Sequence, residues 1–181
     1  MNDLVFITGN QKKADYLAKW LGMAVPYRRA DVDEIQSLDL GEVVGHKARQ
    51  AYEIVKQPVL VEDVALTFHG LGRLPGTLIR WFLEELGNEG LADLAATLET
   101  QAATASILYG LYDGERLRTF ASDKPGRIAS TPRGENGFGW NAVFIPEGYD
   151  KTYAEMTDAE LRQTSLRAEA IEKLRAFLQN P

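Results

Sequence analysis

The sequence predicts an α/β protein in which a mixed β-sheet is flanked by helices. Over residues 1–100, short apolar runs alternate with segments of helical periodicity. Strand-like segments joined by an Asp113-Gly114 turn, a strong hairpin signal, follow in residues 103–145. Helical spacing returns after residue 157. This order of elements is typical of a mixed sheet covered by helices.

The first elements have clear boundaries in the sequence. Residues 4–7 form a short apolar run, typical of a buried strand, and residues 11–21 have helical spacing, with Gly22 as a fitting helix stop. Residues 40–55 predict a second helix, and Lys47 falls on its apolar stripe. A lysine in that position either extends its ammonium past the apolar surface to water or meets an anion.

The following elements include one strand that ends in acidic residues. Residues 58–61 predict a buried strand with Glu62 and Asp63 at its end, where the active sites of open α/β sheets gather. Thr157 and Glu160 match a helix capping box. The remaining expected elements are a turn at Pro75-Gly76, helices over 77–86 and 89–98 separated by Gly87, strands over 103–111, 116–121, 126–130 and 142–145, and a C-terminal helix through Leu166, Ala170, Leu174 and Phe177.

Length and composition predict an ordinary globular protein. The 181 residues fit one domain, or one domain with two lobes, so we expect residues 1–181 to form a single domain. The chain contains no cysteine, which excludes disulfides, thiolate metal ligands and thiol catalysis. A sequence without cysteine suits a reducing compartment, and we expect a cytoplasmic protein.

The charge pattern restricts the class of partner. A formal net charge of −6 argues against a large basic face, so no nucleic-acid partner is expected. No stretch approaches the roughly 18 apolar residues of a membrane span, and the N-terminus lacks the features of a signal peptide, so no membrane partner is expected. Basic residues occur instead in small groups such as Lys12-Lys13 and Arg28-Arg29, which suit small anions or an ordinary solvated surface.

Thr8, Gly9 and Asn10 form a tight turn between the first strand and the first helix. A helix N-terminus exposes free N–H groups and the positive end of the helix dipole. The side chains of Thr8, Asn10 and Lys13 add donors, so the turn could cradle a phosphate. Its spacing is not that of a Walker A loop. A polar turn with an exposed lysine pair is the alternative interpretation.

Two groups of acidic residues could hold a metal ion. Asp31, Asp33 and Glu34 share one loop, and Glu62 and Asp63 follow a strand. Mg²⁺ prefers a few carboxylates together with water and substrate phosphate oxygens. A carboxylate could also orient or deprotonate an attacking water. Carboxylates at loop ends are common, so neither group alone identifies a site.

Residues 134–141 are rich in glycine and contain Phe138 and Trp140. Glycine lets the backbone come close to a ligand, and an aromatic face can stack on a nucleobase. A glycine-rich hairpin with aromatic residues in the core explains the same pattern equally well.

Four blocks, in the family's own order, resemble the inosine triphosphate pyrophosphatase family, and the resemblance covers nearly the whole chain. Thr8 to Lys13 is similar to the family's Thr-Gly-Asn-x-x-Lys start. Ser165-Leu166-Arg167 is similar to the Ser-His-Arg motif near its C-terminus. The other two blocks are Val61-Glu62-Asp63 with residues 71–76, similar to the family's acidic strand end and Leu-Gly-Gly-x-Pro-Gly turn, and residues 138–144 with 146–149 and 152–156, similar to its most distinctive block.

The resemblance implies two lobes with a central cleft, a homodimer, and Mg²⁺-dependent hydrolysis of a noncanonical nucleoside triphosphate to a monophosphate and pyrophosphate. It implies that Glu34 and Asp63 hold Mg²⁺ and that Asp63 also acts as the base for the water. The remaining implied residues bind the substrate: Thr8, Gly9, Asn10, Lys12, Lys13 and Lys47 at the phosphates, and Phe138, Gly139, Trp140, Asn141, Ser165 and Arg167 at the end that reads the base.

This sequence departs from the family pattern at the base-reading end. Asn141 stands where the family has an aspartate, Ala142 replaces the following proline, and Leu161 and Leu166 replace a lysine and a histidine. These changes remove charged hydrogen-bond partners from the base edge. A site that hydrogen-bonds its ligand rejects analogues that leave its polar groups unpaired. We therefore predict family-type chemistry with altered base selection.

Two other functions remain open at this point. One is a pyrophosphohydrolase for a pyrimidine or modified nucleotide, or for another pyrophosphate-linked compound. The other is a nucleotide-binding protein without turnover. Glu34, Lys13 and Asp63 count against the second, because a protein that only binds its ligand has no need of an acid that activates water.

Overall fold

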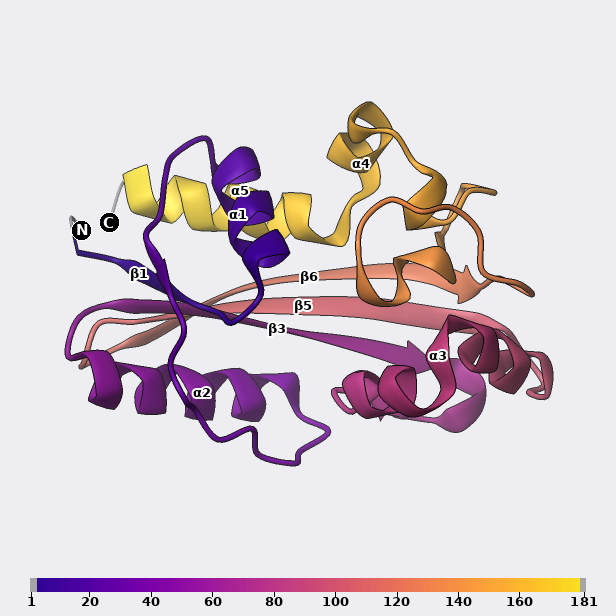
Figure 1. The fold of residues 1–181 in the computed structure, drawn as a ribbon, viewed down its shortest axis with the longest axis horizontal. Coiled ribbons are helices and arrows are strands. Elements are labelled where there is room, and N and C mark those ends of the chain that lie inside the picture. The colour runs from indigo at the N-terminus through magenta and orange to yellow at the C-terminus, as the bar shows by residue number, and fades with distance from the viewer. Residues whose placement is uncertain (1–2, 180–181) are drawn as a thin grey trace. The chain divides into compact units, whose positions relative to one another are not determined.

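The computed structural model describes residues 3–179, which form a seven-stranded mixed sheet with flanking helices. The strands follow the order β2-β1-β3-β5-β6-β7, and β4 pairs with β3. This architecture confirms the predicted fold class (Figure 1). The strands are β1 Val5–Ile7, β2 Tyr27–Arg28, β3 Val59–Phe68, β4 Pro75–Gly76, β5 Ala102–Tyr112, β6 Leu117–Ile128 and β7 Phe144–Pro146. The helices are α1 Gln11–Leu21, α2 Leu40–Val55, α3 Ile79–Ala96, α4 Asp158–Thr164 and α5 Leu166–Gln179, with short 3-10 turns η1 His69–Leu71, η2 Gly139–Ala142 and η3 Tyr153–Glu155.

The chain divides into two compact units. Unit 1 contains the described residues up to Asp63, together with residues 107–122 and 169–179. Unit 2 contains residues 64–106 and 123–168. Strands β3, β5 and β6 each contribute residues to both units.

Unit 1 is a three-layer arrangement. Strand β1 runs parallel to both β2 and β3. Helices α1 and α5 lie on one face of these strands and α2 lies on the other (Figure 1). The small residues Ala48 and Ala51 of α2 are fully buried in a cluster with β1 and β3, so the helix axis comes close to the sheet.

Local capping signals explain why α1 and α2 occupy the residues predicted for them. Asn10 caps α1 by accepting a hydrogen bond from the Lys12 amide, and Gly22 ends the helix in the left-handed conformation with φ 74°. Asp39 caps α2 in the same way at Gly41.

Unit 2 confirms several other predictions. Helix α3 is interrupted at Gly87, whose φ of 64° and ψ of −177° are not helical. Thr157 and Glu160 form the predicted capping box at the start of α4. Two pairings that the sequence did not predict also occur in this unit: β4 pairs antiparallel with β3, and β7 pairs antiparallel with β6.

The strand predictions were wrong in extent. Strand β3 continues to Phe68, so Glu62 and Asp63 lie inside the strand and not at its end. Residues 126–128 belong to the long strand β6, and Pro75-Gly76 is a short strand and not a turn. Residues 139–142 form η2, so β7 begins only at Phe144. These strands are extended by pairing with partners distant in sequence, which local periodicity does not report.

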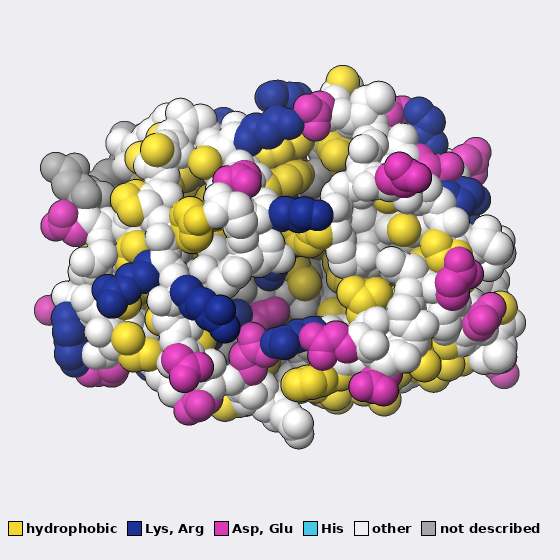
Figure 2. All heavy atoms as spheres, viewed as in Figure 1, with side chains coloured by type: hydrophobic (Ala, Val, Ile, Leu, Met, Phe, Trp, Pro, Cys, Tyr) yellow, Lys and Arg dark blue, Asp and Glu magenta, His cyan; other side chains and the backbone are white. Residues whose placement is uncertain are grey.

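Charged side chains of both signs lie on the surface of the described residues. Acidic and basic side chains are interspersed over the face drawn in Figure 2. Among the helices of residues 3–179, none is long and apolar enough to cross a membrane.

Candidate functional site

The turn between β1 and α1 is fixed by its own hydrogen bonds. The Thr8 amide donates to the Arg28 carbonyl at 3.1 Å, which continues the pairing of β1 with β2. The Thr8 hydroxyl accepts from the Asn10 amide at 3.1 Å, and the Asn10 side chain accepts from the Lys12 amide at 3.0 Å. The Arg29 side chain lies over Gly9, with its Nε 3.8 Å from the position that a Cβ would take there. The turn therefore presents a helix N-terminus with cationic side chains beside it.

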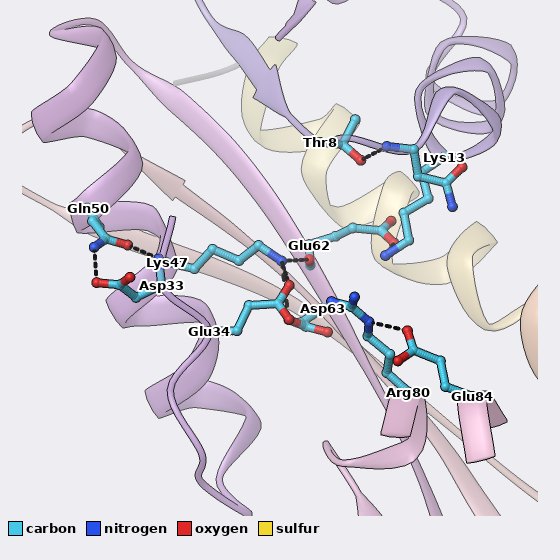
Figure 3. A network of polar contacts seen from close by, with 11 residues as sticks. Thr8, Lys13, Asp33, Glu34, Lys47, Gln50, Glu62, Asp63, Arg80 and Glu84 are labelled. Atoms are coloured by element: carbon cyan, nitrogen blue, oxygen red, sulfur yellow. Dashed lines mark hydrogen bonds and ion pairs between the residues drawn. The ribbon is translucent and has the colours of Figure 1, made fainter. Parts of the chain in front are cut away.

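Lys13 extends from α1 to the sheet. Its ammonium lies 3.0 Å from a carboxylate oxygen of Glu62, and the Glu62 side chain is only 2% exposed (Figure 3). A buried carboxylate is stable only with a close, well-oriented counter-charge. Glu62 therefore fixes where the Lys13 ammonium lies.

Lys47 meets carboxylates at the edge of the apolar surface of α2. Its ammonium lies 3.3 Å from Asp63 and 3.9 Å from Glu34, and it donates to the Glu62 carbonyl at 3.4 Å. Of the two interpretations left open by the sequence, the structure shows an ammonium bound by anionic groups, here the protein's own. Glu34 and Asp63 converge on one cation, so these two side chains could share a divalent metal.

The loop that carries Glu34 is attached to α2. Gln50 donates from its amide nitrogen to the Asp33 carboxylate at 2.7 Å, and its amide oxygen accepts from the Asp33 backbone N–H. Gln50 and Lys47 are three residues apart on the same helix (Figure 3).

The carboxylates of Glu62 and Asp63 pair with lysines of different helices because strand residues alternate between the two faces of a sheet. Glu62 faces α1 through Lys13, and Asp63 faces α2 through Lys47. From the sequence, both acids were expected at a strand end, and only Asp63 was predicted to have a role. The signal for Glu62 was the apolar run on both sides of the acidic pair, which indicates a continuous strand with its acids buried on opposite faces.

In unit 2, the residues predicted to read the base lie in η2 and around the start of α5. The guanidinium of Arg167 lies over the ring of Phe138, 5.0 Å from its centroid, and Arg167 is 7% exposed. Ser165 accepts a hydrogen bond from the Arg167 amide at 3.2 Å, which holds the first turn of α5. Phe138, Ser165 and Arg167 are thus brought together.

The other predicted residues of this group pack or form hydrogen bonds near Phe138 in the sequence. Trp140 is buried and packs edge-on to Phe144 at 5.7 Å between ring centroids. The Gly139 carbonyl accepts a hydrogen bond from Asn88 of α3 at 3.1 Å. The Asn141 side chain lies against Gly137, where a Cβ would come within 2.1 Å of its amide nitrogen.

The two leucines that replace charged family residues differ in environment. Leu166 is buried at the start of α5, whereas Leu161 on α4 is half-buried. The core of unit 2 therefore accepts an apolar side chain at position 166 without an unsatisfied polar group.

The fold and the charged groups define an α/β protein in which lysines of two helices pair with the adjacent acids of β3. Residues 4–177 match the Ham1 family model, and the chain belongs to the Ham1 family.

Relatives similar over nearly their whole length support this membership. The chain is 42% identical over 180 residues to an inosine triphosphate pyrophosphatase of Yarrowia lipolytica, covering 97% of this chain and 95% of the relative. It is 41% identical to inosine triphosphate pyrophosphatase 2 of Trypanosoma cruzi, covering 96% of this chain and 90% of the relative. The predicted family resemblance is confirmed.

Solved structures share the fold. A HAM1 protein from Coxiella burnetii matches with a TM-score of 0.85 and 22% identity over 98% of both chains. The Staphylococcus aureus Ham1 protein matches with a TM-score of 0.82 and 24% identity, covering 97% of this chain and 98% of that one.

Proposed function

We propose that this protein hydrolyses a noncanonical nucleoside triphosphate, or its deoxy form, to the monophosphate and pyrophosphate. One observation carries the proposal: Glu34 and Asp63 converge on Lys47, in a chain 42% identical to an inosine triphosphate pyrophosphatase. In this reaction water attacks the α-phosphorus and the bond from that phosphorus to the α–β bridging oxygen breaks. Pyrophosphate leaves, and the water proton passes to a base.

The phosphates would be bound at the turn between β1 and α1 and by the neighbouring lysines. Thr8, Gly9 and Asn10 present the N-terminus of α1, which favours anions through its N–H groups and dipole. Lys12, Lys13 and Lys47 would supply cationic donors. Each ammonium carries three N–H donors, so Lys13 and Lys47 can keep a carboxylate partner while donating to a phosphate oxygen.

Glu34 and Asp63 would hold Mg²⁺. Mg²⁺ is commonly bound by one or two carboxylates, with waters and substrate phosphates completing its shell. Glu34 and Asp63 fit this pattern because their carboxylates already meet around one cation, 3.9 Å and 3.3 Å from the Lys47 ammonium. When bound, Mg²⁺ supplies charge neutralisation at the phosphate oxygens. Asp63 is in addition the base that we assign to the water.

We assign the nucleobase to the group predicted around Phe138. The Phe138 ring, with the Arg167 guanidinium over one face, offers a stacking surface. The other residues that we assign to this end are Gly139, Trp140, Asn141 and Ser165. Because Asn141, Leu161 and Leu166 replace charged family residues, we expect base selection to differ from a strict preference for inosine and xanthosine. We further propose a cytoplasmic homodimer whose ligand is the nucleotide.

A panel of purine, pyrimidine and modified nucleoside triphosphates with Mg²⁺, assayed for pyrophosphate and for orthophosphate, tests the proposal. We expect pyrophosphate without orthophosphate. Asp63→Asn should lower the rate by about 10²–10⁴-fold, the usual contribution of a general base. Asp93→Asn, an exposed change on α3, is the matched control.

The panel also separates the alternatives. Turnover confined to pyrimidine or modified nucleotides would replace the proposed substrate class. Binding without any product would indicate a nucleotide-binding protein, and release of orthophosphate alone would mean that the β–γ bond is cut. A strong preference for inosine and xanthosine triphosphates would refute altered base selection.

A further inference from the structure

Glu34 lies in a segment that has no regular structure of its own. Residues 29–39 form neither helix nor strand, and the Glu34 side chain is 46% exposed. A carboxylate on such a segment must still reach the same place each time a cation binds. Something outside the segment has to fix it, because ordering a free loop on binding costs conformational entropy.

Gln50 supplies that attachment. Its side-chain amide makes two hydrogen bonds to Asp33, one to the carboxylate and one from the backbone N–H. This pairing fixes the backbone at position 33 as well as the side chain, and Glu34 is the next residue. The two partners are 17 residues apart in sequence, so the contact belongs to the tertiary fold.

The same helix carries the cation that Glu34 faces. Residues three apart on a helix are neighbours on its surface, so Gln50 and Lys47 share one face of α2. The loop, through Gln50, and the Lys47 ammonium are thus both attached to helix α2. In this arrangement the Lys47 ammonium lies 3.9 Å from the Glu34 carboxylate.

We propose that Gln50 is a positioning residue that holds Glu34 in place for the metal. The inference rests on the proposed metal-binding role of Glu34 and adds a residue that the family resemblance did not indicate. Outer-shell partners of metal ligands typically change metal affinity by 10–100-fold when mutated. Since Gln50 acts through the backbone of the adjacent residue, we expect about a tenfold effect, at the low end of that range.

The test uses one disrupting variant and one exchange. Gln50→Met keeps the length and charge of the side chain but removes both hydrogen bonds. The double variant Asp33→Asn/Gln50→Glu reverses the bond between the two side chains, because the new amide at position 33 donates to the new carboxylate at position 50. That carboxylate also accepts from the backbone N–H of position 33, as the Gln50 amide oxygen does. The double variant keeps the net charge of the protein. Gln163→Met, an exposed change on α4, is the control for the same substitution elsewhere.

Three measurements are made on each folded protein. Hydrogen exchange reports the protection of the Asp33 amide. Electron paramagnetic resonance of free Mn²⁺ gives the dissociation constant of the metal alone. The Mg²⁺ concentration for half-maximal pyrophosphate release is compared with kcat at saturating Mg²⁺.

We expect Gln50→Met to lose protection at Asp33, while the α2 amides keep theirs. The Mn²⁺ dissociation constant and the half-maximal Mg²⁺ concentration should both rise about tenfold, with kcat changed less than twofold. The double variant should restore all three values, and Gln163→Met should match the wild type.

Loss of Asp33 protection with an unchanged Mn²⁺ dissociation constant would overturn the inference. So would a double variant that regains protection but not metal affinity. If the wild-type protein releases no pyrophosphate from any nucleotide, the proposed function fails, but the exchange and Mn²⁺ measurements still decide the role of Gln50.

Discussion

The buried carboxylate of Glu62 makes Lys13 important for stability as well as for any phosphate contact. Replacing Lys13 by Met leaves Glu62 buried without this counter-charge. Removing one partner of a buried ion pair costs about 3–5 kcal/mol. Because Lys13 is partly exposed, we expect Lys13→Met to lower the free energy of unfolding by about 3 kcal/mol, measured by urea denaturation.

A double variant tests whether the charge of Glu62, left without Lys13, causes the loss of stability. Lys13→Met/Glu62→Gln removes both charges and should recover most of the lost stability, because a neutral amide is far less costly to bury. Lys12→Met, at the exposed neighbouring position, should have little effect on stability. Equal destabilisation by Lys12→Met and Lys13→Met would show that the ion pair is not the cause.

At the residue scale, the sequence predicted those contacts that depend on local pattern. Lys47 was identified because a lysine on an apolar helical stripe needs an explanation. The role of Glu62 was not predicted, because strand β3 was taken to end at residue 61. The Gln50–Asp33 contact has no sequence signal, since a glutamine on a half-buried helix face is compatible with many partners.

At the level of elements, the β5–β6 hairpin depends on Asp113. Hydrogen bonds from the Arg116 backbone, the Arg118 guanidinium and the Glu115 backbone hold the pKa of the Asp113 carboxyl well below its usual range. A lowered folded-state pKa means that the ionised carboxylate stabilises the fold above the unfolded pKa of about 3.9. That contribution is lost as the pH falls below this value.

Asp113→Ala should therefore lower the free energy of unfolding by about 2 kcal/mol at pH 7, because it removes three partly exposed hydrogen bonds of about 0.5–1.5 kcal/mol each. The loss should be smaller at pH 2. Urea denaturation at both pH values checks the expectation, with Asp93→Ala as the control for an exposed carboxylate. An equal loss at both pH values would assign the effect to the neutral turn geometry and not to the charge.

The helices were predicted more closely than the strands, for a physical reason. Helices α1 and α2 begin and end at residues whose capping is encoded within four positions. Strands β3 and β6 extend because distant segments pair with them, as β7 does with residues 126–128. The length of a strand is a property of its partners, so local periodicity underestimates it.

At the scale of the whole molecule, three strands contribute residues to both units. If one of these strands loses its structure in unit 1, the part of the same strand in unit 2 is expected to lose its pairing as well. We therefore expect a single unfolding transition in urea. Trp20 reports on unit 1 and Trp140 on unit 2.

Two variants test this cooperativity. Trp81→Phe/Trp140→Phe keeps Trp20, and Trp20→Phe/Trp81→Phe keeps Trp140. In each, the midpoint by fluorescence should coincide with the midpoint by circular dichroism, which is the standard sign of two-state unfolding. Separate midpoints within either variant would show that one unit loses its structure before the other.

The two acidic side chains of β3 also differ in length. The difference is one carbon–carbon bond, about 1.5 Å. The longer one spans to α1 and the shorter one to α2. A chain carrying Asp-Glu in place of Glu-Asp would have the same composition and charge, yet each lysine would meet an acid of the wrong length. The order of the two acids thereby matches each carboxylate to the lysine on its own face of the sheet.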